Sequence, residues 1–120
     1  MTEDECAKGG EQGEGRKLII SKAVKKELAG IPEAKREQFL FSLELVRLGQ
    51  LPALPHEKLK AAGEGVVELK INGSPAFRCM YYVTDCGDVV VLHASAKTAQ
   101  RQSKHLVNTT RLRMKAAKKS

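Results

Sequence analysis

Apolar residues in the N-terminal half of the chain have the spacing of two consecutive helices. A short apolar run at Lys17–Ile20 predicts a first strand, and Ser21 is a suitable N-cap for the helix that follows it. That helix is expected to end at Gly30, and Pro32 opens a second helix that runs to about Leu48. The apolar stripes of the two helices are formed by Ala23, Val24 and Leu28 and by Phe39, Leu43 and Val46.

The central part of the chain alternates between apolar and polar residues, which is typical of half-buried strands. Two such strands, 66–71 and 76–83, surround a turn at 72–74. A third strand is expected at 88–94, and a polar, basic helix at 103–119. This order of elements predicts an α+β domain in which the helices pack on one face of a small, mostly antiparallel sheet.

The two strands around the turn at 72–74 present different chemistry on their two faces. The odd-numbered positions form an apolar core face of Val67, Leu69, Ile71, Phe77, Cys79, Tyr81 and Val83. The other face carries Glu68, Lys70 and Arg78, and a three-residue loop sets Glu68 directly opposite Arg78. Two interpretations are open. One is a cross-strand ion pair on a solvated face, and the other is a phosphate site, in which arginine clamps phosphate oxygens and lysine acts as a point charge.

The orientation of His93 depends on the length of the turn around Asp85–Asp88. A three-residue loop with Gly87 in the left-handed region pairs Cys79 with His93 and puts the imidazole on the core face. A four-residue loop pairs Met80 with His93 and puts the imidazole beside the arginine of the preceding strand. Glycine at the third loop position favours the first alternative.

The charge of the chain is unevenly distributed. The net charge is +7, and residues 1–15 contain five acids and one lysine, a local charge of −4. Residues 16–120 therefore carry +11 once this −4 is subtracted from the total. We expect a flexible acidic tail over residues 1–15 and one basic domain over residues 16–120. A domain this basic suits a polyanion such as RNA, or an acidic protein.

The composition also limits location and cofactor chemistry. No apolar run approaches the ~20 residues that span a bilayer, and the acidic, glycine-rich start is not a signal peptide. We therefore expect a cytoplasmic protein without a membrane partner. The three cysteines lack the paired spacing of a zinc site, so no bound metal is expected.

Several ordered segments of the chain resemble the RelE superfamily of toxins, most closely its HigB-like, phage-derived branch. They are Leu59–Lys60, the run GVVELKI at Gly65–Ile71, the run FRCMYYV at Phe77–Val83, and Val89–Ala94 followed by Lys97. The resemblance covers roughly residues 16–116. It implies a RelE-like fold, with two N-terminal helices and a C-terminal helix on the sheet. It further implies a ribosome-dependent endoribonuclease of a type II toxin–antitoxin system, with an antitoxin protein, the ribosome and mRNA as partners, and with no cofactor.

Enzymes of this superfamily use the 2′-hydroxyl of the RNA to attack the neighbouring phosphate, without a metal. Matched position by position, the resemblance implies that Arg78 contacts the scissile phosphate and that Lys70 is the basic residue of the preceding strand. It also implies that Lys60 is the lysine of an "LKG"-like segment. Glu68 matches the strand glutamate and is a candidate base, although an ion pair with Arg78 would weaken it in that role. His93 is a candidate general acid, because imidazole titrates near neutral pH.

Three further residues are candidates for RNA binding. Lys97 and Arg101 lie in the basic segment after the last strand, and Tyr82 is a candidate for stacking on a base. The chain also departs from the family pattern, because Val67 replaces an aromatic residue and Ala94–Ser95 replace a Gly-Phe pair. The alternative function is therefore a catalytically weak RelE-like module that binds RNA or a protein partner.

Overall fold

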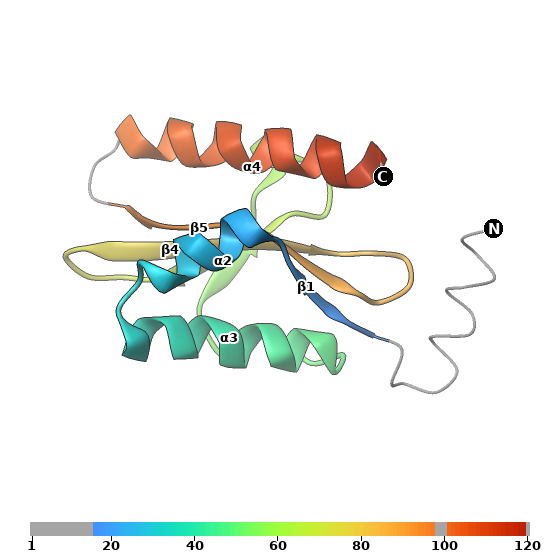
Figure 1. Ribbon diagram of the computed structural model, residues 1–120, viewed down its shortest axis with the longest axis horizontal. Coiled ribbons are helices and arrows are strands. Elements are labelled where there is room, and N and C mark those ends of the chain that lie inside the picture. Colours follow the sequence, from blue (N-terminus) through green and yellow to red (C-terminus); the bar gives the residue numbers. More distant parts are fainter. Residues whose placement is uncertain (1–15, 98–100, 120) are drawn as a thin grey trace.

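The computed structural model describes residues 16–97 and 101–119, with side chains over 16–97 and 104–118. The expected acidic tail, residues 1–15, lies outside the described residues. The elements, in chain order, are β1 (Leu18–Ile20), α2 (Lys22–Ala29), α3 (Glu33–Arg47), β2 (His56–Lys58), the 3-10 helix η1 (Lys60–Ala62), β3 (Val67–Ile71), β4 (Ala76–Val83), β5 (Val89–Lys97) and α4 (Arg101–Lys119). They form the expected α+β domain, which is consistent with a RelE-like fold (Figure 1).

The five strands form one mixed sheet in the order β1-β5-β4-β3-β2. β1 runs parallel to β5, whereas the other neighbouring strands are antiparallel. The edge strand β2 was not predicted from the sequence. Its three residues are all exposed and polar, so no apolar alternation marks it as a strand. Within the described part of the chain, no helix has the length and apolarity to cross a membrane.

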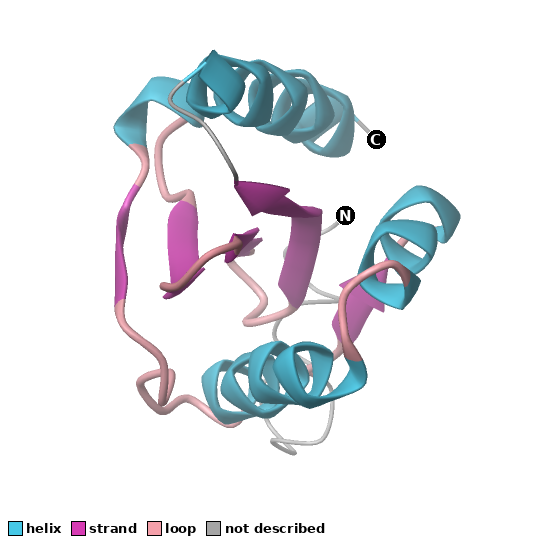
Figure 2. Cartoon of the chain, turned by 90° about the vertical axis from the view of Figure 1, so that its left-hand side faces the viewer, coloured by secondary structure: helices cyan, strands magenta, loops and turns pink. Residues whose placement is uncertain are grey.

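The helices cover both faces of the sheet, and the expectation of helices on one face is wrong (Figures 1 and 2). α2 and α3 pack on the predicted core face, where Leu69, Cys79 and Tyr81 are buried as expected. The opposite face also carries apolar residues, and α4 and η1 cover it. That second core contains Ala62, Val66, Met80, Tyr82, Leu92, Leu106 and Met114. Large apolar side chains on both faces require cover on both sides.

The two N-terminal helices begin and end close to the predicted positions. The Ser21 side chain accepts a hydrogen bond of 3.3 Å from the Val24 N–H and caps α2. α3 ends at Arg47, and the chain turns at Gly49, whose φ is +86°. A Cβ atom at Gly49 would lie 2.9 Å from Nη1 of Arg16, so glycine suits this turn in both conformation and space.

The β3–β4 pairing keeps the predicted faces but differs in register. Ile71 pairs with Phe77 and Lys70 pairs with Arg78, whereas Glu68 lies opposite Met80 rather than Arg78. The loop is longer than three residues because Pro75 has no N–H and cannot extend the ladder. The shift changes the pairing by two positions, an even number, so each side chain stays on its predicted face.

The β4–β5 pairing corrects the favoured interpretation of His93. Met80 pairs with His93 and Tyr81 pairs with Val91, because a bulge lies between Met80 and Tyr81. Cys79 instead pairs with Ala94. The turn itself contains Gly87 with φ of +92°, as expected, but the bulge adds a residue that the turn length alone does not predict.

Candidate functional site

Charged side chains from three neighbouring strands meet on the face of the sheet that also carries α4. The Nε atom of Arg78 lies 3.4 Å from Oε2 of Glu68, so the predicted ion pair forms, although diagonally rather than directly across the strands. On the edge strand, Oε1 of Glu57 accepts a hydrogen bond of 2.7 Å from Nζ of Lys70. We call Glu57, Glu68, Lys70 and Arg78 the Arg78 cluster.

The guanidinium of Arg78 is held on two sides. Its Nη1 donates hydrogen bonds to the backbone carbonyls of Phe77 at 3.0 Å and of Ile71 at 3.5 Å, while Nε faces Glu68. The residue is only 7% exposed. A cation fixed in this way loses little conformational entropy when an anion binds, which is the condition for electrostatic stabilisation of a developing charge.

Glu57 is a member of the cluster that the sequence did not indicate. Its hydrogen bond from Lys70, followed by the charge of that ammonium group, holds the pKa of Glu57 below its usual range. Glu57 pairs with Glu68 across β2 and β3, so two carboxylates and two cations share one patch. The patch is therefore close to neutral as it stands, and an incoming phosphate competes with carboxylates for the two cations.

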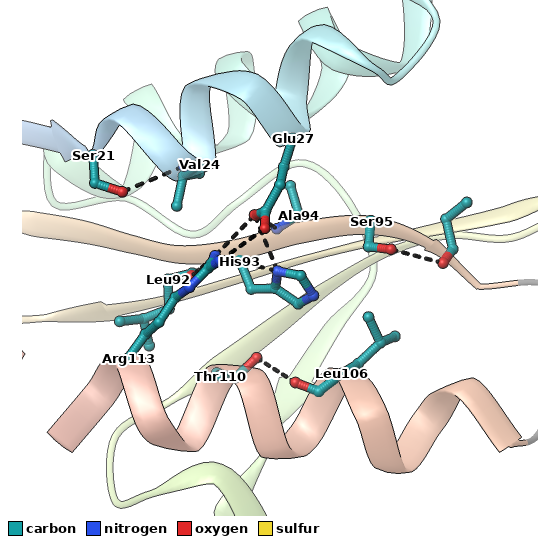
Figure 3. A network of polar contacts seen from close by, with 11 residues as sticks. Ser21, Val24, Glu27, Leu92, His93, Ala94, Ser95, Leu106, Thr110 and Arg113 are labelled. Atoms are coloured by element: carbon teal, nitrogen blue, oxygen red, sulfur yellow. Dashed lines mark hydrogen bonds and ion pairs between the residues drawn. The ribbon is translucent and has the colours of Figure 1, made fainter. Parts of the chain in front are cut away.

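His93 is buried at a different place, where the edge of β5 is uncovered. β1 ends at Ile20, which pairs with Val91, so no strand of the described residues pairs with the following residues of β5 on that side. Side chains from two helices replace the missing strand. The Ala94 N–H donates to Oε1 of Glu27 at 3.2 Å, and Nη1 of Arg113 donates to the Leu92 carbonyl at 3.0 Å (Figure 3).

The same two side chains hold the imidazole. Nδ1 of His93 lies 3.0 Å from Oε1 of Glu27, and Arg113 forms an ion pair with Glu27 at 2.9 Å. We call these three residues the Glu27–His93–Arg113 cluster; Figure 3 shows it between α2 and α4. A carboxylate only accepts hydrogen bonds, so the proton of the neutral imidazole resides on Nδ1. Nε2 is buried, has no hydrogen-bond partner among the described residues, and is left as an acceptor.

The pKa values of the cluster follow from burial and pairing. Burial lowers the pKa of His93, and this outweighs the opposing effect of the nearby Glu27 carboxylate. Burial alone would raise the pKa of Glu27. The hydrogen bond from Arg113 and the interactions with His93 and the Ala94 N–H outweigh it, so the pKa of Glu27 is lowered. Both shifts favour a neutral imidazole beside a charged carboxylate at neutral pH.

The family described as "Phage derived protein Gp49-like (DUF891)" matches residues 26–115. The chain belongs to the Gp49-like family. This phage-derived family is related to the RelE-type toxins of toxin–antitoxin systems, whereas the finer HigB-like placement stays a prediction. No curated protein and no solved structure matched the chain.

The other predicted site residues of this Gp49-like protein are dispersed. Lys97 pairs with Ala76 at the end of β5, two positions from the Arg78–Ser95 pair, and lines a cavity of about 380 Å³ with Gly73, Ser74 and Pro75. Lys60 lies on η1 and faces α4 rather than the Arg78 cluster. Arg101 opens α4, but its side chain lies outside the described residues.

The structure argues against the predicted stacking role of Tyr82. The residue is 9% exposed and packs in the core beneath α4, and burial raises the pKa of its hydroxyl. The ring therefore has no open face for a nucleobase, and the stacking role is corrected to a core role. Among the described residues, no group of three His, Cys, Asp or Glu side chains has the arrangement of a metal site.

Sequence reasoning also missed Glu27 and Arg113. A signal for Glu27 was present, because this acid lies between Val24 and Leu28 on the apolar stripe of α2. An acid in such a stripe needs a buried partner. In α4, Arg113 is likewise a charged residue directly beside a buried apolar residue, Met114. Which partner each residue finds depends on how the two helices cross the sheet, and the spacing within one helix does not give that.

Proposed function

We propose that this Gp49-like protein is a toxin that cleaves mRNA on the ribosome and that a cognate antitoxin restrains. The relation of its family to toxins of toxin–antitoxin systems supports the class. The observation that carries the enzymatic part is the fixed Arg78 guanidinium, with Lys70 beside it on β3 and Lys97 farther along the same face. A surface with few available aromatic residues suits an RNA substrate that the ribosome positions.

The proposed reaction is a transesterification within the RNA chain. The 2′-oxygen forms a bond to the adjacent phosphorus while the bond to the 5′-oxygen breaks, which yields a 2′,3′-cyclic phosphate and a 5′-hydroxyl. Arg78 and Lys70 stabilise the extra negative charge of the pentavalent state. Glu68 accepts the proton of the 2′-hydroxyl, while its partner Arg78 contacts the phosphate from its fixed position. The ammonium group of Lys97 is the proton donor that we assign to the departing oxygen.

His93 is a weaker candidate for the general acid than the sequence suggested. Its lowered pKa and its hydrogen bond to Glu27 leave Nε2 without a proton at neutral pH. A group in this state can accept a proton but has none to give from Nε2. We therefore propose that His93 acts structurally, by joining α2 to β5.

Induced expression in bacteria tests the proposal. The wild-type chain should arrest growth, and co-expression of the antitoxin should restore it. Arg78→Ala should abolish the arrest, whereas Arg47→Ala, which removes an arginine paired with Glu44 on α3, should leave it intact. Thermal unfolding of both variants separates loss of the site from loss of the fold. Unchanged growth with well-expressed wild-type protein would exclude the proposed toxin function.

A specific observation favours the second candidate, a catalytically weak RelE-like binding module. Every cation of the Arg78 cluster already faces a carboxylate, and Arg78 is almost fully buried. If RNA does not displace these carboxylates, the face binds without cutting. The two functions differ in outcome, because the module retains RNA or partner binding while ribosome-bound mRNA stays intact.

A further inference from the structure

α4 carries a stripe of basic residues along one side. The stripe follows one face of the helix, because its members are three or four residues apart. They are the basic residues Lys104, Arg111, Lys115 and Lys118, with the uncharged Asn108 between the first two. All are exposed, whereas Leu106, Thr110 and Met114 point into the core. α4 contains no aspartate or glutamate. Over 14 intervals of 1.5 Å the stripe extends about 21 Å.

The 3-10 helix η1 packs along this stripe and makes it concave. One cavity of about 260 Å³ lies between the two elements, and its charged lining residues are Lys60, Glu64, Arg111, Lys115 and Lys118. A second cavity of about 390 Å³ continues along the helix and is lined by Ala61, Lys104, Val107 and Asn108. Among the described lining residues of the first cavity, four cations against one acid favour binding of an anion.

Gly63 makes the close approach of the two elements possible. Its φ of +144° is a conformation that other residues rarely adopt. A Cβ atom at this position would lie 3.2 Å from Cγ of Met114, closer than ordinary packing. The concave surface is therefore built into the fold, because the backbone at Gly63 sets Lys60 beside the cations of α4.

We propose that this α4–η1 surface, formed by Lys60, Lys104, Arg111, Lys115 and Lys118, binds the phosphodiester backbone of RNA. The partner follows from the lining: cations bind phosphates, and none of the described lining residues of either cavity is aromatic and able to stack on a base. Recognition is thus independent of sequence. The inference rests on the proposed function in taking RNA as the ligand, but it uses none of the residues of the Arg78 cluster.

The salt dependence of RNA binding tests this surface directly. The probe is a short RNA duplex of mixed sequence, without ribosomes, titrated by fluorescence anisotropy over a series of salt concentrations. The variant is Arg111→Ala/Lys115→Ala/Lys118→Ala. The matched control is Lys22→Ala/Lys25→Ala/Lys26→Ala, which removes the same charge from exposed positions on α2. All six residues are exposed, so both variants should fold.

We expect the α4 variant to bind the RNA duplex at least tenfold more weakly than the wild type. The slope of log affinity against log salt should fall by about 2 to 3, which is about one per lost phosphate contact. The α2 control should keep the wild-type slope. Equal losses in both variants, or a loss in neither, would overturn the proposal. It would also be overturned if the α4 variant lost binding to polyglutamate while RNA binding was unchanged.

The outcomes for this surface and for the proposed function are separable. Arg47→Ala should keep the wild-type salt slope on the duplex, since Arg47 pairs with Glu44 on α3, outside both the α4–η1 surface and the Arg78 cluster. If the slope falls as expected in the α4 variant but wild-type protein cuts no ribosome-bound mRNA, only the proposed enzymatic function fails. If mRNA is cut and the α4 variant binds the duplex normally, only the α4–η1 surface fails.

Discussion

Glu27 of α2 and Arg113 of α4, on helices that cover opposite faces of the sheet, form an ion pair of 2.9 Å at the edge of β5 (Figure 3). The pair satisfies backbone groups of Leu92 and Ala94 that β1 is too short to reach. It therefore joins both helical layers to the middle of the domain, although it lies away from the Arg78 cluster.

Glu27→Gln should destabilise the fold by about 2 kcal/mol, because a charged hydrogen-bonding centre with several partners is lost in a largely buried place. Urea denaturation of the purified variant measures the change. Glu44→Gln is the control, because it breaks an ion pair with Arg47 on the outer surface of α3. Its unfolding midpoint should stay near that of the wild type. Equal losses in the two variants would show that Glu27 does not have this joining role.

The stability of the domain should fall as the pH is lowered, in two steps. The pKa of His93 is lowered in the folded state from its ordinary value of 6.5, so the unfolded chain takes up this proton first. Stability therefore begins to decline below about pH 6.5. The pKa of Glu27 is lowered from 4.5, so its contribution is present above that value and is lost as the pH falls through the folded-state pKa.

Urea midpoints measured across this pH range test both steps. His93→Asn should remove the first decline and keep the second. The ionisable groups that act on the imidazole are Glu27 from α2 and Arg113 and His105 from α4. If the urea midpoint of His93→Asn falls below pH 6.5 as steeply as that of the wild type, the first step belongs to another residue.

Gly63→Ala should lower stability more than Gly65→Ala does. Both glycines have a positive φ, so both substitutions strain the backbone. Only a Cβ at Gly63 meets a neighbour, at 3.2 Å from Met114, whereas the space around Gly65 is open. The difference in unfolding free energy reports the contact between η1 and α4. A larger loss at Gly65 would show that η1 does not depend on this close approach.

Glu57→Gln should strengthen the interaction of the Arg78 cluster with RNA, because a carboxylate that competes for Lys70 is removed. We expect a severalfold lower KM for ribosome-bound mRNA at low salt and a smaller change at high salt, where exposed charges are screened. Glu33→Gln, on the first turn of α3, gives the same change in net charge and serves as the control. A KM lowered equally by both variants would reflect net charge alone.

The sequence predicted those parts of the fold that local patterns determine. The period of two in β3 and β4 assigned Leu69, Cys79 and Arg78 to the correct faces, and an error of two positions in register left those faces unchanged. Ser21 and Gly30 bounded the first N-terminal helix for equally local reasons. The ion pair between Glu68 and Arg78 was also predictable, because long side chains bridge diagonal positions as well as opposite ones.

The remaining features depend on contacts between distant segments. β2 has no apolar residue to mark it, so Glu57 could not be placed beside Lys70. The bulge beside Met80 changed the partner of His93 without any signal in the turn. Tyr82 would be exposed if helices covered only one face of the sheet. In the structure α4 covers the other face, and the ring is buried.

The proposed enzymatic function depends most on Arg78, and cleavage of ribosome-bound mRNA by purified protein tests this role most directly. Wild-type protein should cut the message to 2′,3′-cyclic phosphate and 5′-hydroxyl ends without added metal. Arg78→Ala, folded as judged by circular dichroism, should cut at least about 100-fold more slowly, the usual effect of losing one preorganised stabilising group. Cleavage at the wild-type rate by folded Arg78→Ala, or no cleavage by the wild type on ribosomes, would contradict the proposed catalytic role of Arg78.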